Sequence, residues 1–184
     1  MSETTLPSRF VSPERVIAQF GVADGMHIAD FGCGSGHFTL AAAARAKESG
    51  KVYAIDIQQD LLGKLKNVAR AARLNNIEIV WGDIEQPRGS TLPDKSMQAV
   101  LLTNILFQLK HKDEAIAEIK RVLSSGGRVL LVDWRGSFGN MGPREEDVVT
   151  EDAAMEKFEN AGFRLVGRIS MNGYHYGLIF KKAL

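Results

Sequence analysis

The sequence has little cysteine, no long apolar run and no surplus of charge of either sign. Its 184 residues include one cysteine, Cys33, which excludes an intrachain disulfide and is compatible with a reducing compartment. No apolar stretch approaches the roughly 20 residues of a membrane span. Met1 to Ser12 lacks the basic-then-apolar pattern of a secretory signal. We therefore expect a cytoplasmic protein without a membrane span.

The balance of charge also argues against some partners. The 23 basic and 22 acidic residues leave a formal net charge of +1, so we expect no nucleic-acid partner. Hydrophobic residues make up 45% of the chain, enough for the core of one domain of this length. No repeat or linker divides the sequence. Residues 1–184 are expected to form a single domain, with the aperiodic residues 1–11 as a flexible tail or lid.

Segments of strand type alternate with segments of helix type. Strands are expected at 28–30, 52–55, 77–81, 97–103, 128–132, 163–169 and 174–180. Helices are expected between 12 and 21 and at 39–45, 58–74, 113–123 and 151–160. The alternation predicts an α/β fold with a mostly parallel sheet covered by helices on both faces.

Local signals refine this pattern. Ser12-Pro13-Glu14 is typical of a helix start, and Gly21 of its end. Helical spacing predicts one apolar face with Leu61, Leu65, Val68 and Ala72. Gly126-Gly127 is expected to be a turn before the fifth strand. Asn172-Gly173 predicts an antiparallel hairpin at the end of the chain, so one strand should run against the others.

The segment from Ile28 to Phe38 predicts a ligand site. A strand ends in Asp30, glycines follow at alternate positions as Gly-x-Gly-x-Gly, and a helix then begins. Glycines at such a turn let a ligand approach the main chain, and the first N–H groups of the helix point toward it. The dinucleotide pattern would need a third glycine at position 37, which is His37. The pattern alone indicates a nucleotide-type cofactor without identifying it.

Five expected strands end in polar residues or glycine. They are Asp30-Gly32, Asp56, Gly82-Asp83, Thr103-Asn104 and Asp133. Acids at successive strand ends are costly unless they bind a ligand or are solvated in a cleft. Ligands of open parallel sheets bind outside the carboxyl ends of the strands. Asp56 would suit the ribose of NAD or of another adenosine.

Over about residues 12–184 the sequence resembles the class I S-adenosylmethionine (SAM)-dependent methyltransferases. Asp30–Gly36 resembles the first motif of that family, Val52–Ile57 the second and Gly82–Ile84 the third. The resemblance implies a three-layer Rossmann-like methyltransferase fold, with a seven-stranded, mostly parallel sheet and an antiparallel C-terminal hairpin strand. It also implies SAM as the cofactor and no metal.

The branch that the sequence resembles most is that of the ubiquinone/menaquinone biosynthesis C-methyltransferases, which implies a small-molecule methyl acceptor. Thr103-Asn104-Ile105-Leu106 replaces the Asn/Asp-Pro-Pro-aromatic signature of many enzymes that methylate amides or nucleobases. That difference argues against an RNA or protein acceptor. A homodimer stays open.

The resemblance also implies roles for individual residues. The glycine turn would pack against the methionine and ribose of SAM, and Asp30 would favour the methionine ammonium. Asp56 would hold the ribose diol and Asp83 the adenine amino group. The full set of expected cofactor residues is Asp30, Gly32, Gly34, Gly36, Asp56, Ile57, Asp83, Ile84, Thr103 and Asn104. Of these, Ile57 and Ile84 would sandwich adenine, and Thr103 and Asn104 would lie near the methionine end.

The sequence does not identify a general base. The titratable candidates are His37, His111, Asp133 and His175. Among the histidines, His37 and His175 also have a structural interpretation, and His111 that of an exposed surface residue. Trp134 suits either a substrate wall or core packing. The loop 135–147 suits either substrate contact or disorder.

Three alternatives to a small-molecule methyltransferase stay open. One is a SAM-binding partner subunit without turnover, and another is an RNA or protein methyltransferase. The third is a small NAD-dependent oxidoreductase, against which the missing glycine at position 37 counts.

Overall fold

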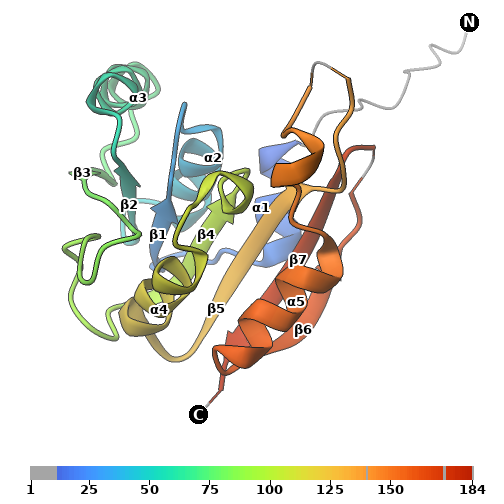
Figure 1. Cartoon of the computed structure of the whole chain (residues 1–184). Coiled ribbons are helices and arrows are strands. Elements are labelled where there is room, and N and C mark those ends of the chain that lie inside the picture. The colour runs from blue at the N-terminus through green and yellow to red at the C-terminus, as the bar shows by residue number, and fades with distance from the viewer. Residues whose placement is uncertain (1–11, 140, 172, 184) are drawn as a thin grey trace, which may run out of the picture.

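A seven-stranded sheet with the order β3-β2-β1-β4-β5-β7-β6 runs through the centre of the molecule. The structure is a computed structural model that describes residues 12–139, 141–171 and 173–183 (Figure 1). The strands are β1 (His27–Phe31), β2 (Lys51–Asp56), β3 (Ile77–Trp81), β4 (Met97–Thr103), β5 (Leu123–Trp134), β6 (Phe163–Ile169) and β7 (His175–Lys182). The α-helices are α1 (Pro13–Phe20), α2 (His37–Ala46), α3 (Gln59–Ala71), α4 (Lys112–Val122) and α5 (Glu151–Asn160), and the short 3-10 helices are η1 (Leu106–Gln108) and η2 (Glu145–Asp147).

Strand directions confirm the expected fold class. Strands β3, β2, β1, β4 and β5 pair in parallel, whereas β7 pairs antiparallel with both β5 and β6. The order of the parallel strands reverses between β1 and β4. This reversal leaves a crevice outside the carboxyl ends of those two strands, where ligands of open α/β sheets bind.

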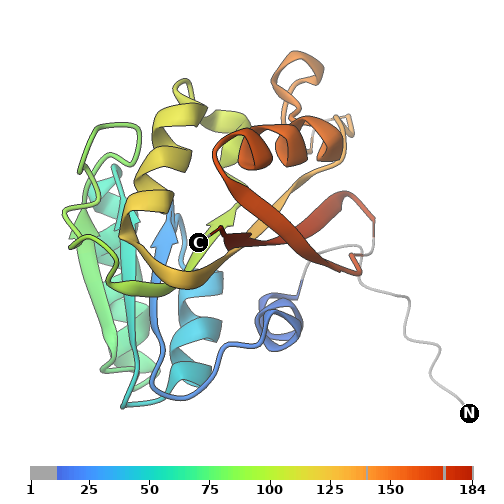
Figure 2. The ribbon, with the colours of Figure 1, turned by 90° about the horizontal axis from the view of Figure 1, so that it is seen from below.

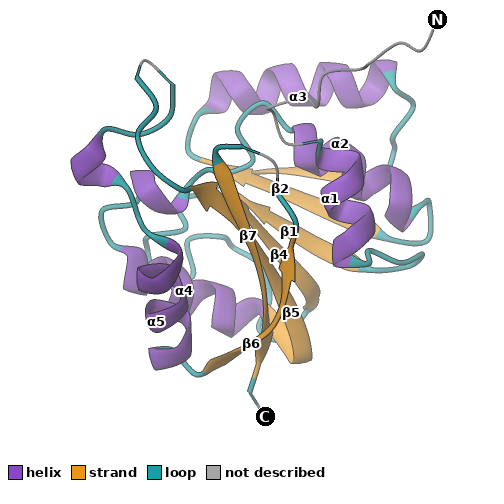
Figure 3. Ribbon diagram, turned by 90° about the vertical axis from the view of Figure 1, so that its right-hand side faces the viewer, coloured by secondary structure: helices purple, strands orange, loops and turns teal. Residues whose placement is uncertain are grey.

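Helices cover both faces of the sheet (Figures 2 and 3). Helices α1 and α2 share an apolar cluster with Ile28 of β1, whereas α4 and α5 share another with Ala29 and Phe31. Consecutive β1 residues therefore point to opposite layers, as the pleat of a strand requires. Both faces are apolar because both are covered.

Helix α1 begins and ends where its sequence signals predict. Ser12 accepts a hydrogen bond from the Arg15 N–H at 3.5 Å, and Pro13 occupies the first turn. Gly21 ends the helix with a left-handed backbone at φ 80°. The helix buries Val16, Ile17 and Phe20 against the sheet layer.

Two local predictions were wrong. Helix α3 buries Leu62, Leu65 and Ala69, whereas Val68 is exposed, because the neighbouring row of apolar residues faces β2. Gly126-Gly127 does not precede β5 but lies inside it, where the pairing of β4 with β5 shifts register between Met97 and Ala99. The glycine pair thus lies in an irregular stretch within β5 rather than in a turn before it.

Residues 1–11, expected to be a tail or lid, and Asn172 of the expected hairpin turn lie outside the described residues. Within the part of the chain that is described, no helix is long and apolar enough to cross a membrane.

Candidate functional site

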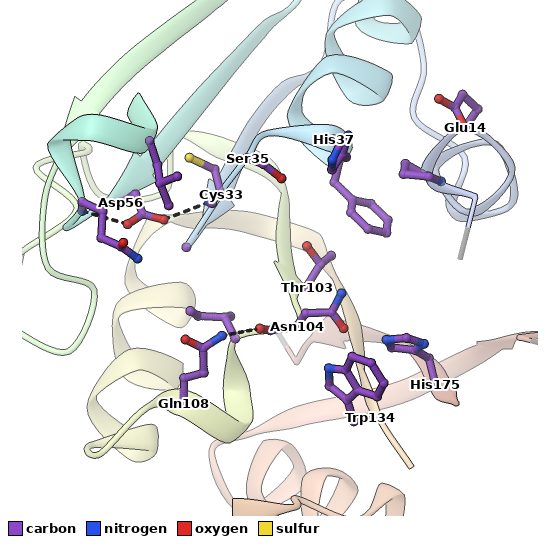
Figure 4. Close-up of a pocket in the computed structure, with 17 residues that line it drawn as sticks. Glu14, Cys33, Ser35, His37, Asp56, Thr103, Asn104, Gln108, Trp134 and His175 are labelled. Atoms are coloured by element: carbon purple, nitrogen blue, oxygen red, sulfur yellow. Dashed lines mark hydrogen bonds between the residues drawn. The ribbon is translucent and has the colours of Figure 1, made fainter. Parts of the chain in front are cut away.

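A cavity of about 640 Å³ lies at the carboxyl ends of the parallel strands (Figure 4). Its walls are the start of α1, the glycine turn after β1, the start of α2, Asp56 and Gln58 at the end of β2, Thr103–Ile105 at the end of β4, and Trp134 with His175. A smaller hollow of about 130 Å³ adjoins it, with Asp56 and Gln58 in both walls. The combined space is in the usual range for small-ligand sites, roughly 300–1,000 Å³.

The three glycine positions of the turn differ in the space that each leaves for a side chain. A Cβ at Gly32 would come within 2.6 Å of the Ile105 side chain, and one at Gly36 would overlap the Leu65 side chain. A Cβ at Gly34 would meet nothing within 4 Å. Gly32 and Gly36 are therefore required by packing, whereas Gly34 leaves open space in the cavity wall.

Asp56 connects the turn to the strand beside it. Its Oδ2 accepts a hydrogen bond from the Gly34 N–H at 2.9 Å, and its Oδ1 accepts one from the Gln58 N–H at 2.9 Å. An ionised carboxylate has about four acceptor positions, so two remain for a ligand in the cavity that this side chain lines.

Asp30 lies behind the turn rather than in the cavity wall. The side chain is fully buried within β1, and the Thr39 hydroxyl donates to its Oδ2 at 2.6 Å. Its Oδ1 has no partner among the described residues. Burial raises the pKa of Asp30 to about 7, and the charge of Asp56 adds to this effect while the bond from Thr39 opposes it.

Asn104 turns sharply after β4. It has a left-handed backbone with φ 56°, which asparagine tolerates better than most residues. Its N–H donates to the Val132 carbonyl at 2.8 Å, and its own carbonyl accepts from Gln108 Nε2 at 2.9 Å. The buried Oδ1 has no partner in the described part of the chain. Asn104 and Thr103 both line the cavity.

The smaller hollow brings together three residues that were expected around adenine. Ile57 and Ile84 line it together with Asp83. Ile84 is buried, whereas Ile57 is 62% exposed. Asp83 Oδ1 accepts from the Glu85 N–H at 2.9 Å, and the Trp81 indole donates to the Ile57 carbonyl at 3.1 Å.

The structure separates the titratable candidates. His37 is exposed and lines the cavity, whereas His111 is exposed at the start of α4 and is not part of the cavity wall. Asp133 is buried away from the wall, where its oxygens accept from the Phe107 and Trp134 N–H groups at 3.3 and 2.8 Å. Burial raises its pKa to about 6. Its observed contacts hold η1 against the end of β5.

His175 lines the cavity beside Trp134, although the sequence favoured a structural role. Its side chain is 3% exposed, and the two ring centroids are 4.3 Å apart. Neither ring nitrogen has a hydrogen-bond partner among the described residues. Burial lowers the pKa of His175 below its ordinary value. Figure 4 shows the two rings together at the end of the cavity farther from Asp56.

Other wall residues carried no recognisable sequence signal. Gln108 and Phe38 belong to this group. Cys33 lies in the wall as a small neutral side chain, because burial raises the pKa of its thiol. In the loop 135–147 the described residues are not part of the wall, and Phe138 packs on Tyr174 with ring centroids 4.5 Å apart. Among the described residues, no group of three His, Cys, Asp or Glu side chains is arranged to hold a metal.

Comparison with known proteins supplies independent information. A family model described as a methyltransferase domain matches residues 23–175. Ubiquinone/menaquinone biosynthesis C-methyltransferases of Cupriavidus necator and Paraburkholderia phymatum are 30% and 31% identical to this chain over 118 residues. Those matches cover 64% of this chain and 47% of each relative, so the chain spans about half the length of the curated relatives it matches.

A solved structure is similar over nearly the whole chain. The crystal structure of a SAM-dependent methyltransferase from Aquifex aeolicus superposes with a TM-score of 0.85 at 26% identity. The alignment covers 96% of this chain and 93% of that one.

Proposed function

This chain belongs to the methyltransferase domain family, and we propose that it transfers a methyl group from SAM to a small-molecule acceptor. SAM is the cofactor that the family and the solved relative indicate. The names of the curated relatives, which describe quinone biosynthesis, support a small-molecule acceptor. We also propose that residues 1–184 act as one domain in the cytoplasm.

The observation that carries the proposal is that Asp56 lines the smaller hollow, next to Asp83 and two isoleucines. The two free acceptor positions of this carboxylate suit the two hydroxyls of a ribose. The hollow beside it presents Asp83 and the side chains of Ile57 and Ile84. A carboxylate and two aliphatic side chains in the wall of one hollow suit a flat heterocycle with an exocyclic amino group. The adenosine of SAM would fit this arrangement.

The glycine turn and the end of β4 would hold the other half of the cofactor. Asp30 Oδ1 and Asn104 Oδ1 are buried acceptors with no donor among the described residues. Such atoms destabilise a fold unless a donor reaches them, directly or through water. The ammonium group of the methionine moiety is a donor of the right charge, which would also lower the pKa of Asp30.

When bound, SAM supplies a methyl group that is already activated by the positive sulfur. The chain therefore needs no nucleophilic side chain. Its residues have to orient the two reactants and exclude water, which is a large part of catalysis in such reactions. Gly34 would let the cofactor lie against the main chain, and Thr103 with Asn104 would form the floor near the reacting groups.

Calorimetry with S-adenosylhomocysteine (SAH), the product of the reaction, tests the proposal. We expect the intact protein to bind SAH, and Asp56→Ala or Asp83→Ala to weaken binding by about 1–3 kcal/mol. Asp113→Ala is the matched control, because this carboxylate is 79% exposed in an ion pair on α4. Absence of SAH binding would contradict the proposal. NAD in a parallel titration tests the oxidoreductase alternative, and methylation by the purified protein alone would exclude a non-catalytic subunit.

A further inference from the structure

The end of the larger cavity opposite Asp56 has a distinct chemistry. Trp134 of β5 and His175 of β7 are directly paired across the antiparallel ladder and both face the cavity. Phe38 near the start of α2 also lines the cavity, and Figure 4 shows Glu14 of α1 across it from Trp134 and His175. If the cofactor occupies the end at Asp56, this end is left for the methyl acceptor.

Packing alone does not explain why the polar side chain of His175 is buried without hydrogen bonds. A buried polar group that lacks a hydrogen bond costs about 1–3 kcal/mol, and most buried polar side chains have a partner. Both ring nitrogens of His175 lack one among the described residues. The neighbouring charged groups are engaged elsewhere. Arg135 Nε donates to the His175 backbone carbonyl at 2.7 Å and its guanidinium pairs with Glu151, while the Asp133 carboxylate accepts from backbone N–H groups.

The state of this imidazole suits proton transfer. Burial lowers the pKa of His175, so the ring is neutral near neutral pH and one nitrogen can accept a proton. The other titratable groups that line the same cavity are Glu14, Cys33, His37 and Asp56, of which Glu14 and His37 are exposed. Histidine is the side chain that most often serves as a general base, and a base must lie within hydrogen-bond reach of the proton that it accepts.

The charge of the wall restricts the acceptor. Among the described residues, no lysine or arginine lines the larger cavity, whereas Glu14 and Asp56 contribute carboxylates. A carboxylate or phosphate on the acceptor would meet no cation here and would lose its hydration on entry. The wall therefore favours neutral or cationic acceptors.

We infer that His175 accepts the proton from a hydroxyl or amine group of a methyl acceptor that is not anionic and that lies against Trp134. The inference rests on the proposed function. In the step, the lone pair of the acceptor oxygen or nitrogen forms a bond to the methyl carbon. The bond between that carbon and sulfur breaks with its electrons left on sulfur, and the proton of the acceptor passes to an unpartnered nitrogen of His175.

Histidine NMR on the SAH-loaded protein tests this role without a known substrate. The chain has four histidines, so the resonance that disappears in His175→Phe identifies His175. The probes are para-nitrophenol, benzylamine and the anion para-nitrobenzoate. We expect para-nitrophenol and benzylamine to shift the His175 resonance. In His175→Phe, para-nitrophenol affinity should fall about tenfold, which corresponds to one lost hydrogen bond of about 1.4 kcal/mol.

The controls separate this inference from the proposed function. His111→Gln changes a histidine outside the cavity wall and should leave the probe responses unchanged. SAH affinity should be similar in His175→Phe, because the expected adenosine contacts lie at the other end of the cavity. If SAH binds but neither para-nitrophenol nor benzylamine moves the His175 resonance, the inference is overturned while the proposed function stands. Tighter binding of para-nitrobenzoate than of para-nitrophenol would also overturn it. Failure of SAH to bind contradicts the proposed function itself.

Discussion

Alanine at Gly34 and at Gly36 should have opposite consequences for ligand binding and stability. Both residues have a left-handed backbone, with φ 52° and 81°, so each substitution should cost about 1–2 kcal/mol of folding free energy. At Gly36 the new Cβ also overlaps the buried Leu65 side chain. Overpacking of this kind typically adds about 1–3 kcal/mol. Gly36→Ala should therefore be less stable than Gly34→Ala by about 1–3 kcal/mol.

The new methyl group at Gly34 would project into open space in the cavity wall. We expect it to occupy volume that the cofactor needs, so Gly34→Ala should lose SAH affinity by more than tenfold while it stays folded. Urea unfolding gives the stability of both variants, and calorimetry with SAH gives the affinity. With a urea m value of about 1–3 kcal/mol per molar, the two unfolding midpoints should differ by roughly 1 M. Equal stabilities, together with unchanged SAH binding by Gly34→Ala, would refute this explanation of the turn.

Three further predictions concern residues around the site and behind it. Glu118→Ala should lower the free energy of unfolding by about 3 kcal/mol, because the buried carboxylate accepts from Arg121 at 2.7 Å and from the Ser90 N–H at 3.1 Å. Burial opposes the ionisation of Glu118, but these bonds hold its pKa below the ordinary value. The stabilisation that they give is therefore present above the ordinary pKa of glutamate and is lost as pH falls through the folded pKa. Thermal melts over acidic pH should show this loss in the wild type and not in Glu118→Gln. Asp30→Asn should bind SAH more weakly and should also remove a pH dependence of stability. Because the folded pKa of Asp30 is about 7, the free energy of unfolding of the wild type should fall by about 4 kcal/mol at most as pH rises from about 4 to 7. Equal slopes of unfolding free energy against pH in the two proteins would contradict this. Trp81→Phe removes the hydrogen bond to the Ile57 carbonyl but keeps an aromatic ring at a position that is 65% exposed, so SAH affinity should fall by about 1 kcal/mol with little change in thermal stability; a shift in melting temperature without a change in affinity would contradict it.

The parts of the fold that sequence predicted well are those with strong local signals. Strand β4 and helix α5 have the predicted bounds, because each combines a clear apolar period with defined ends. The apolar face of α3 was wrong, because the row through Leu61 and the row through Leu62 share Leu65 and have similar spacing. Only the partner settles the choice, since Leu62 packs with Cys33 and Ala54 whereas Leu61 lines the cavity.

For the candidate site, the sequence predicted where the motif residues lie along the chain but not which of their side chains reach the cavity. Asp56 and Asp83 lie beside the cavity as the strand ends suggested, whereas Asp30 is hidden inside β1. Depth along the strand decides that difference, because Asp30 pairs with Ala54, two residues before Asp56 at the end of β2. The sequence could not place His175 beside Trp134, which is 41 positions earlier and is brought next to it by the pairing of β5 with β7. No local pattern reports such a long-range pair.

The hydrogen bond between Asp56 and the Gly34 N–H also bears on which cofactors the turn rejects. In dinucleotide-binding folds, the N–H groups of the glycine turn are available to a pyrophosphate. Here the central N–H is already bonded to a carboxylate at 2.9 Å. A pyrophosphate at this position would lose that donor and would lie next to a like charge, which costs binding free energy. A sulfonium cofactor, which is positively charged, would instead be attracted. The same internal bond that shapes the loop thus makes it selective for the sign of the charge that it meets.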